Sequence, residues 1–493
     1  MTMATTIAEV INDQLARDPE EGAIQFHGTW YSRARLKAFV DKIDAALAAA
    51  GVPEGAPIGF APHNRPAFAA ALVALFSRQR PIVMIYAYQS PEAIANKLRD
   101  LKLPAVIAGV EQWTDPTLNA ARDLGSAAIA LSDDGAEVEL LEPWKAVPGV
   151  EQRKSDGVPS VALLTSGTTG PPKHFEISYE KLLKRMVIAT EFGASERNPL
   201  FSFFPLGNIS GIYLIVPAIA SGQPIIMVDK FNVADWVAFV KQYKPEFLGV
   251  PPAAFRMILD ADVDYDDISS LKLINTGAAT LDPALRREFE AKYPILVTQS
   301  YGATEFGGIV TITTPDHVKE FGDSKADSVG RPCPGVKLRV VDVDSGADLP
   351  AGEEGRLLVF APGMSDDYIE TTDLVMIDPD GFLFHRGRLD GAIMRGGFKI
   401  VPEQVMEALN RHPKVAASAV VGLAEPRLGA VPVALVQPRD MDDAPDAASL
   451  DTHLRSLLPK TMIPTDYRVV KALPRTPSLK IDMGAAKRMF EAT

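Results

Sequence analysis

Cysteine and long apolar runs are almost absent from this chain. Cys333 is the single cysteine, which rules out an intrachain disulfide and fits a reducing compartment. No stretch approaches the roughly 18 apolar residues of a membrane-spanning helix, and the run Ile212–Ile219 is interrupted soon after. Residues 1–22 carry acidic side chains and no apolar core of signal length, so we expect no export signal.

Basic residues are also fewer than acidic residues in this chain. Lysine and arginine number 50 against 63 aspartates and glutamates, which gives a formal net charge of −13. This excess of negative charge argues against nonspecific binding to nucleic acid or to an anionic membrane. We therefore expect a cytoplasmic protein with no nucleic-acid partner and no integral membrane segment.

The remaining composition is that of an ordinary globular protein, with 47% hydrophobic and 23% charged residues. A length of 493 residues exceeds the size at which a single core stops growing, so two or more domains are expected. Short apolar runs alternate with longer amphipathic stretches, which favours an α/β fold with largely parallel sheets. The predicted strands are 81–86, 105–108, 224–228 and 271–274, and the predicted helices are 33–50, 65–78, 91–101, 233–243 and 282–292.

The sequence changes in character toward its C-terminus. From about residue 328 to residue 386, glycine and proline separate short strands such as Lys337–Val341, which predicts a β-rich subdomain. After this stretch, strands alternate with helices in a compact α+β segment. We therefore predict a large N-terminal domain over 1–389 and a small C-terminal domain over 390–493.

The densest motif is LTSGTTGPPK at Leu164–Lys173, which follows a short apolar run. Its glycines let the backbone approach an anion closely, and its N–H groups and hydroxyls can form an anion-binding concavity. Lys173 adds a point charge suited to phosphate. The alternative is a plain surface turn. A Walker loop is excluded, because Pro172 stands where glycine would precede the lysine, and prolines here disfavour an immediate helix start.

Four further motifs follow this loop along the chain. They are SYGATE at 300–305, TD at 372–373 with GRLD at 387–390, RGGFKIVPE at 395–403 and LPRTPSLK at 473–480. Together with TSGTTGPPK they resemble, in the same order, the signature motifs of the adenylate-forming superfamily. That superfamily includes acyl-CoA synthetases, peptide-synthetase adenylation domains and beetle luciferases. The chain most resembles an acyl-CoA ligase.

The resemblance implies ATP-dependent activation of a small-molecule carboxylic acid through an acyl-adenylate, followed by transfer to CoA. ATP, Mg²⁺ and CoA are the implied cofactors and substrates. The residues that would hold the ATP phosphates are Thr165, Ser166, Gly167, Thr168, Thr169, Gly170 and Lys173. The residues that would lie against the adenine are Gly277, Ala278, Ala279, Tyr301 and Gly302.

The remaining nucleotide contacts follow from the same resemblance. Glu305 would be the magnesium ligand, since Mg²⁺ is usually held by one or two carboxylates together with phosphate oxygens and water. Thr304 would contact the phosphate or the substrate carboxylate. Asp373 would accept hydrogen bonds from the ribose hydroxyls, and Arg388 would donate to the ribose or phosphate. Lys480 would stabilise the charge that develops at the α-phosphate in the transition state.

The small domain resembles the family's mobile domain, which serves two half-reactions. Asp390 would be the hinge, Gly396 and Gly397 would bind beside CoA, and Lys399 would meet the nucleotide phosphate. Two positions depart from the family pattern, because Thr372 and Leu479 stand where glycine usually precedes the functional aspartate and lysine.

The segment 203–211 resembles the family's substrate gate. Asn208 stands where acyl-CoA synthetases commonly carry histidine, and the segment contains no acid to pair an α-amine. The residues expected to line a pocket for a hydrophobic or aryl acid are Phe204, Asn208, Tyr213 and Val250.

Two alternatives to a CoA ligase stay open. The first is a ligase that loads a separate carrier protein in trans, since no carrier domain follows Lys480 in this sequence. The second, weaker alternative is a luciferase-like or catalytically silent adenylate-binding protein, and the intact Lys173, Glu305, Asp373 and Lys480 argue against silence. The identity of the acid and the presence of a homodimer are also left open.

Overall fold

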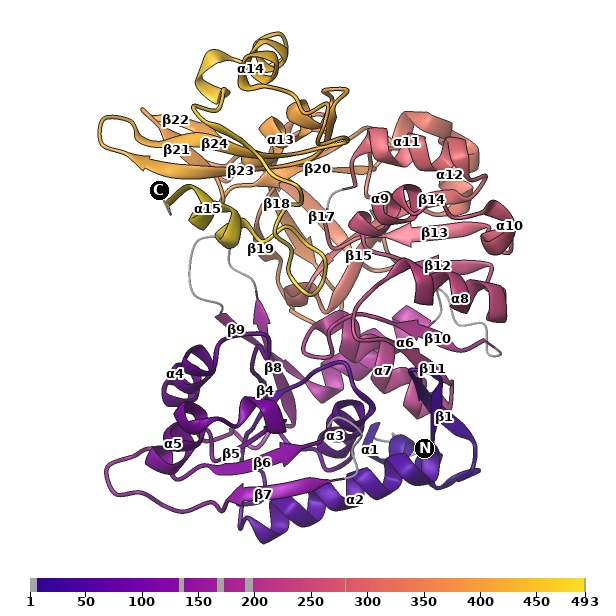
Figure 1. Ribbon diagram of the computed structural model, residues 1–493, viewed down its shortest axis with the longest axis vertical. Coiled ribbons are helices and arrows are strands. Elements are labelled where there is room, and N and C mark those ends of the chain that lie inside the picture. Colours follow the sequence, from indigo (N-terminus) through magenta and orange to yellow (C-terminus); the bar gives the residue numbers. More distant parts are fainter. Residues whose placement is uncertain (1–6, 133–136, 166–172, 191–197, 280, 492–493) are drawn as a thin grey trace. The chain divides into compact units, whose positions relative to one another are not determined.

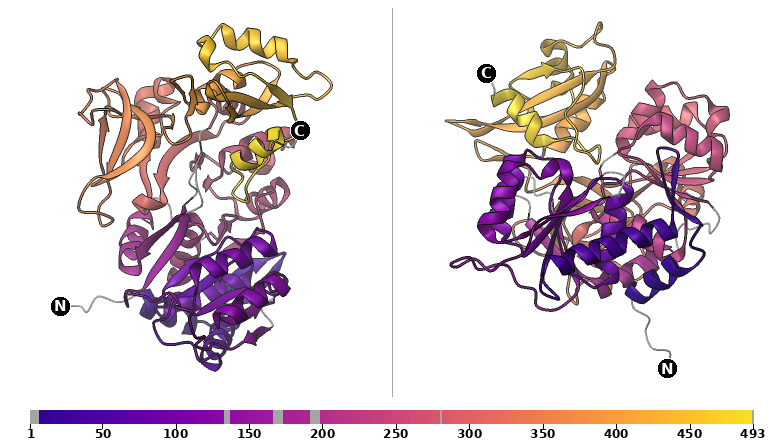
Figure 2. Two further views of the ribbon diagram at one scale, coloured as in Figure 1. Left: turned by 90° about the vertical axis from the view of Figure 1, so that its left-hand side faces the viewer. Right: turned by 60° about the horizontal axis from the view of Figure 1, so that its bottom comes forward.

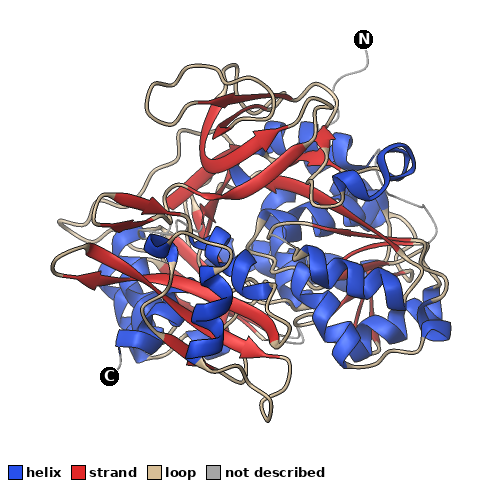
Figure 3. Ribbon diagram, turned by 90° about the horizontal axis from the view of Figure 1, so that it is seen from above, coloured by secondary structure: helices blue, strands red, loops and turns tan. Residues whose placement is uncertain are grey.

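The computed structural model describes residues 7–132, 137–165, 173–190, 198–279 and 281–491. The described residues up to Pro245 form one compact unit, and those from Glu246 onward form a second. Both units mix helices and strands (Figure 3), so the predicted α/β class is confirmed. The predicted boundary between residues 389 and 390 falls inside the second unit and stays a prediction. Within the described ranges, no helix has the length and apolar character needed to cross a bilayer.

A seven-stranded sheet is the centre of the first unit (Figure 1). Its strands are β3 (Ile58–Ala61), β4 (Ile82–Met84), β5 (Ala105–Gly109), β6 (Ala127–Leu131), β7 (Val138–Glu142), β8 (Ser160–Thr165) and β9 (Lys173–Ser178). They lie in the order β7-β6-β5-β3-β4-β8-β9, parallel from β6 to β8 and antiparallel at both edges. The parallel strands β3, β4, β5 and β6 are buried along their whole length, as expected of strands covered on both faces.

Most of the described helices of the first unit lie between its strands along the chain, while the first described helix precedes the first strand and the last follows the last strand. The described helices are α1 (Ile7–Ala16), α2 (Arg33–Ala49), α3 (Pro66–Ser77), α4 (Pro91–Leu101), α5 (Asp115–Leu124), α6 (Tyr179–Thr190), α7 (Ile209–Ser221) and α8 (Val233–Tyr243), with the 3-10 turn η1 (Val110–Gln112). The predicted helices 91–101 and 233–243 are confirmed residue for residue as α4 and α8. Ser90 caps α4 by accepting from the Ala93 N–H at 3.3 Å, with proline at the first helical position. α4 and α5 pack on one face of the sheet through Leu98 and Leu124.

A smaller sheet completes the first unit. Its strands are β1 (Gly22–Phe26), β2 (Thr29–Ser32), β10 (Leu200–Ser202) and β11 (Ile225–Met227), in the order β10-β11-β1-β2. β10 and β1 both run parallel to β11. In this sheet β11 separates β1, near the beginning of the chain, from β10, which leads into the predicted substrate gate.

The second unit begins with a five-stranded sheet. Its strands are β12 (Phe247–Gly249), β13 (Leu273–Thr276), β14 (Leu296–Ala303), β15 (Gly308–Ile312) and β16 (Arg331–Pro332). The helical segments along it are α9 (Pro252–Asp260), α10 (Tyr265–Ile268), α11 (Pro283–Lys292), η2 (Thr304–Phe306), α12 (Pro315–Phe321) and η3 (Gly322–Lys325). Because β12, β13 and β14 are parallel neighbours, the turns that follow β13 and β14 leave the sheet at the same edge.

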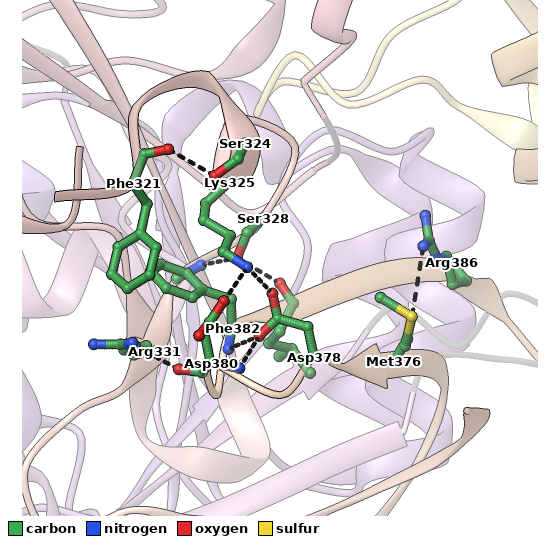
Figure 4. Close-up of polar contacts among 12 residues, drawn as sticks. Phe321, Ser324, Lys325, Ser328, Arg331, Met376, Asp378, Asp380, Phe382 and Arg386 are labelled. Atoms are coloured by element: carbon green, nitrogen blue, oxygen red, sulfur yellow. Dashed lines mark hydrogen bonds and ion pairs between the residues drawn. The ribbon is translucent and has the colours of Figure 1, made fainter. Parts of the chain in front are cut away.

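An antiparallel sheet follows, within the stretch predicted to be β-rich. Its strands are β17 (Lys337–Val341), β18 (Glu354–Phe360), β19 (Ile369–Ile377) and β20 (Leu383–Arg388). Figure 4 shows how the turn between β19 and β20 is held. The Lys325 ammonium lies 2.5 Å from Asp378 Oδ2 and 2.6 Å from Asp380 Oδ2, and the Arg331 guanidinium stacks 4.5 Å from the Phe382 ring. This cluster anchors the β19–β20 hairpin to the end of η3.

The C-terminal segment forms its own sheet, drawn in orange and yellow in Figure 2. Its elements are β21 (Ile393–Arg395), β22 (Phe398–Ile400), α13 (Pro402–Asn410), β23 (Val415–Glu425), β24 (Gly429–Pro438), α14 (Ala447–Arg455), η4 (Lys460–Met462), β25 (Tyr467–Val469) and α15 (Met483–Glu491). Alternation along β23 decides which helix covers which face. Val420 packs in the cluster of α13 and α14, whereas Ala419 and Val421 pack in the cluster of α15.

Candidate active site

The predicted phosphate loop, 164–173, lies in sequence between the paired strands β8 and β9 of the first unit and includes their ends. β8 and β9 pair antiparallel, and Thr165 and Lys173 are the last backbone partners before residues 166–172. The other residues predicted to hold phosphate, Ser166, Gly167, Thr168, Thr169 and Gly170, lie outside the described residues. Their role stays a prediction.

The two predicted adenine segments leave adjacent strands of the second unit. Gly277 follows β13, and a Cβ atom there would lie 2.7 Å from the carbonyl oxygen of Ser300 on β14, so only glycine fits this close approach. The Ser300 hydroxyl donates to Asn275 Oδ1 at 3.0 Å, and Asn275 Nδ2 donates to Thr298 Oγ1 at 3.1 Å. These bonds fix the turn that carries Ala278 and Ala279 against the strand that carries Tyr301.

Ala278 and Gly302 have constrained backbones at this edge. Ala278 has φ +67°, a left-handed conformation that a residue with a Cβ atom rarely adopts. A Cβ atom at Gly302 would lie 2.2 Å from the carbonyl oxygen of Gly308, so the close pairing of β14 with β15 requires glycine there.

Thr304 and Glu305 lie in η2, directly after β14, and both are half-buried. Within the described part of the chain, the Glu305 carboxylate has no hydrogen bond or ion pair, and no group of three or more histidine, cysteine or acidic side chains could hold a metal. A half-buried carboxylate without an ion-pair partner among the described residues suits Mg²⁺, which is usually held by one or two carboxylates plus substrate phosphates and water. Glu305 therefore fits a site in which the nucleotide supplies the other ligands.

Asp373 is buried, with 8% of its surface exposed, and among the described residues its carboxylate has two side-chain hydrogen-bond partners. The Tyr301 hydroxyl donates to Oδ2, and His385 Nε2 lies 3.3 Å from Oδ1. Burial acts to raise the pKa of Asp373, but the bonds to His385 and Tyr301 and the charge of Arg388 outweigh it, so the pKa lies below its ordinary value. The carboxyl is therefore a permanent anion and a hydrogen-bond acceptor at neutral pH.

Tyr301 links this carboxylate to the adenine edge. Burial, followed by the neighbouring Asp373 charge, raises the pKa of Tyr301 well above its ordinary value. Its hydroxyl therefore keeps its proton and acts as a donor to Asp373. Its ring lies 6.1 Å from the Phe306 ring and 5.9 Å from the His385 ring, measured between centroids.

Arg388 is held by three oxygen atoms at the end of β20. It donates to both carboxylate oxygens of Asp390, at 2.9 and 2.8 Å, and its Nη2 also donates to Thr372 Oγ1 at 2.8 Å. The bond to Asp390 raises the pKa of Arg388 above its ordinary value, so its charge is permanent. The residue that replaces the family's glycine, Thr372, thus supplies an acceptor that glycine could not.

Lys480 lies at the end of a small loop closed by the bridge between Arg475 and Ile481. The pKa of Lys480 lies below its ordinary value, first because surrounding protein desolvates the ammonium and second because the Arg388 charge repels it. The side chain still has exposed surface, so the desolvation is partial. The repulsion between the two charges means that an anion bound near both of them would be favoured.

The residue before Lys480 has the kind of backbone conformation that glycine adopts most easily, and glycine is the residue that the family usually has there. Leu479 has φ +62°, and its N–H donates to the Thr476 carbonyl oxygen at 2.8 Å. A left-handed backbone costs a residue with a side chain about 1–2 kcal/mol relative to the ordinary helical region. Leu479 therefore keeps the loop conformation that glycine adopts freely.

The predicted CoA-contacting residues form the turn of the β21–β22 hairpin. Gly396 and Gly397 have φ +56° and +87°, the two consecutive positive values that a tight two-residue hairpin turn requires. Lys399 and Phe398 follow on β22, and both are exposed, Phe398 at 60%.

The predicted substrate residues divide between the two units. In the first unit, Phe204 and Tyr213 are half-buried, and the exposed Asn208 precedes α7 without capping it by its side chain. In the second unit, Val250 is 2% exposed. Their role as pocket residues stays a prediction.

Comparison with known protein families shows which family this chain belongs to. A sequence model of the AMP-binding enzyme family matches residues 11–369, and a model of the AMP-binding enzyme C-terminal domain matches residues 404–480. The chain belongs to the AMP-binding enzyme family. The recognition of an adenylate-forming enzyme from its five motifs is therefore confirmed.

Individual relatives of this AMP-binding enzyme are distant but cover most of its length. Indoleacetate–CoA ligase of Aromatoleum aromaticum is 27% identical over 95% of each chain. Sulfoacetate–CoA ligase of Cupriavidus necator is 28% identical over 79% of this chain and 81% of its own. Among solved structures, ATP-bound MatB from Rhodopseudomonas palustris has a TM-score of 0.81 at 21% identity and covers 98% of this chain and 99% of that chain. At that identity the likeness concerns the fold.

One residue that supports the predicted substrate gate of this AMP-binding enzyme, within the first unit, was missed by sequence reasoning. Asn64 is 2% exposed, and its amide donates to the carbonyl oxygens of Phe203 and Phe204 at 3.3 and 3.2 Å and accepts from the Leu206 N–H at 3.0 Å. It therefore fixes the backbone of the predicted substrate gate. The available signal was an asparagine two residues before a helix whose residues are all buried, but nothing local indicates a partner about 140 residues away.

Proposed function

We propose that this chain is an AMP-forming acid–CoA ligase. In the first half-reaction, a carboxylate oxygen attacks the α-phosphorus of ATP, forms the acyl-adenylate and expels pyrophosphate. In the second half-reaction, the sulfur of CoA attacks the acyl carbon, a thioester forms, and AMP leaves with the former carboxylate oxygen.

One observation carries the proposal. Tyr301 and Asp373 come from widely separated stretches of the sequence, yet the Tyr301 hydroxyl donates to the Asp373 carboxylate, and Arg388 pairs with Asp373 across β19 and β20. The Arg388 charge also acts to lower the pKa of Lys480. These residues combine a buried anion that can accept from sugar hydroxyls with two cations that can face a phosphate. That combination matches a nucleoside monophosphate, the group that the acid must be joined to.

Each residue then has a part in the chemistry. Lys480 and Arg388 would stabilise the negative charge that develops on the α-phosphate oxygens, since their charges are fixed before the reaction begins. Asp373 would orient the ribose and so hold the phosphorus in line for attack. Glu305 would hold Mg²⁺, which screens the phosphate charge and assists the departure of pyrophosphate.

The acid is proposed to be hydrophobic or aromatic. The segment 203–211 holds no carboxylate, so the ammonium of an amino acid would have no ion-pair partner from this segment. Phe204 and Phe203 place two rings 4.2 Å apart between centroids in the same segment, which favours an aryl or alkyl group. A cytoplasmic location and a carrier protein as acceptor stay predictions.

Pyrophosphate release with a panel of aryl, alkyl and amino acids tests the proposal, with each reaction run with and without CoA. We expect ATP-dependent release with an aryl or alkyl acid and formation of the CoA thioester. Release without a thioester would instead favour the carrier-protein alternative. No release with any acid would overturn the ligase proposal, and fastest release with an amino acid would overturn the proposed substrate class.

A further inference from the structure

His385 is a partner of the nucleotide site that none of the signature motifs contains. It lies in β20 between the β19–β20 turn and the GRLD motif, and its side chain is 17% exposed. Its Nε2 lies 3.3 Å from Asp373 Oδ1, within hydrogen-bonding distance. Its ring faces the Tyr301 ring at 5.9 Å between centroids.

A single irregularity in the sheet brings His385 to this position. Asp373 pairs with Arg388 and Leu374 with Gly387, but Val375 pairs with His385, so one extra residue, Arg386, is inserted in β20. Directly opposed residues of an antiparallel pair point to the same face, and residues two apart on one strand share a face. The bulge therefore turns His385 to the face of Asp373, where the regular register would have turned it away.

The backbone and side chains around the bulge agree with this account. Gly387 has φ +131°, a value that favours glycine next to the inserted residue. The Arg386 guanidinium lies 3.9 Å from the Met376 sulfur (Figure 4). Because side chains alternate along a strand, Met376 is on the opposite face of β19 from Asp373. The inserted residue and His385 therefore point to different sides of the sheet.

The two donors fix the Asp373 carboxylate in one orientation. Tyr301 occupies one site of Oδ2 and His385 one site of Oδ1, while a carboxylate offers about four acceptor sites in all. The remaining sites suit two hydroxyl donors that approach together, which is the geometry of a ribose 2′,3′-diol. With one donor removed, the carboxylate would be free to rotate about its bond to Cβ.

We infer that His385 is a positioning residue for nucleotide selection, which acts by holding Asp373 in the orientation that binds the ribose hydroxyls. The inference rests on the proposed function, because Asp373 must meet a ribose. It assigns His385 no contact with the reacting atoms.

The test compares two nucleotides, ATP and 2′,3′-dideoxy-ATP, by calorimetric titration in the absence of acid and CoA. His385→Phe keeps a planar ring and removes the donor, and we expect it to weaken ATP binding about tenfold while leaving dideoxy-ATP binding unchanged. His385→Gln retains an N–H donor and should restore part of the loss. His412→Phe is the matched control, since His412 is a buried histidine that bonds Ser449 at 3.1 Å in the C-terminal segment.

A second measurement uses the wild-type chain and does not depend on folding of a variant. The imidazole nitrogen resonances of His385, identified by their loss in His385→Gln, should shift on addition of ATP and stay in place with dideoxy-ATP. The inference would be overturned if His385→Phe weakened the binding of ATP and dideoxy-ATP equally, or if the two nucleotides shifted the His385 resonances equally. Either result would leave the proposed function intact. Absence of ATP binding by the wild-type chain would overturn the proposed function and the inference with it.

Discussion

The candidate nucleotide site has two ends that are built in opposite ways. At the ribose end, Tyr301, Asp373 and His385 satisfy one another before any ligand is present. At the phosphate end, Glu305 has no ion-pair partner within the described residues, and Lys480 is repelled by Arg388. The ribose end is therefore preorganised, whereas the Glu305 charge at the phosphate end has no ion-pair partner among the residues that the structure describes.

The difference has a physical reason. A sugar is neutral and contributes few strong interactions, so its binding gains most from acceptors that need not reorient. A triphosphate with its metal carries charges of both signs, and it supplies the missing partners itself. Substitutions at the phosphate end should therefore reduce catalysis more than substitutions elsewhere in the second unit.

The largest effect is expected at Lys480. Lys480→Ala should slow adenylate formation about a thousandfold, because a fixed cation at the α-phosphate is lost. Conversion of supplied acyl-adenylate to thioester should continue, and single-turnover assays of each half-reaction measure both. Lys471→Ala, which removes another exposed lysine near the same loop, is the control. Equal loss in both half-reactions would contradict the assigned role.

The next effect concerns the metal. Glu305→Gln should depress acid-dependent pyrophosphate release about a hundredfold, because the amide no longer offers a charged ligand to Mg²⁺. Raising the Mg²⁺ concentration should recover part of the activity. Glu320→Gln changes an exposed acid of α12 and should have no effect. Normal release with normal magnesium dependence would remove Glu305 from the site.

A smaller effect is expected at the junction between the two ends. Asp390→Pro should slow thioester formation about tenfold and spare adenylate formation, because a ring-fixed φ restricts the turn after Arg388. Asp390→Ala breaks the ion pair with Arg388 but leaves the backbone free, so it separates the two roles of this residue. If the alanine variant loses thioester formation as strongly as the proline variant, the hinge assignment is wrong.

The smallest effect is expected at Leu479. Leu479→Gly relieves a left-handed leucine but adds chain entropy to the unfolded state, so stability should rise by at most about 1 kcal/mol. Chemical denaturation measures this change, and adenylate formation should be retained. Leu457→Gly provides the comparison, since Leu457 is exposed and has no positive φ, and it should destabilise the protein. A marked loss of stability in Leu479→Gly would show that the leucine side chain matters for packing.

The sequence by itself determined the family, the α/β class and many element bounds. Local signals suffice for these, because a cap such as Ser90 with Pro91 acts within one helical turn. The motif order likewise indicated Asp373, Arg388 and Lys480 as nucleotide residues.

Only the tertiary structure decided how these residues are supported. His385 reaches Asp373 because one inserted residue shifts the register of β20, and Thr372 reaches Arg388 across the same strand pair. Strand register depends on pairing between distant segments, so no local pattern around His385 or Thr372 could have indicated their partners. The sequence determined which groups carry charge, and the fold determined which of those charges are satisfied before a ligand binds.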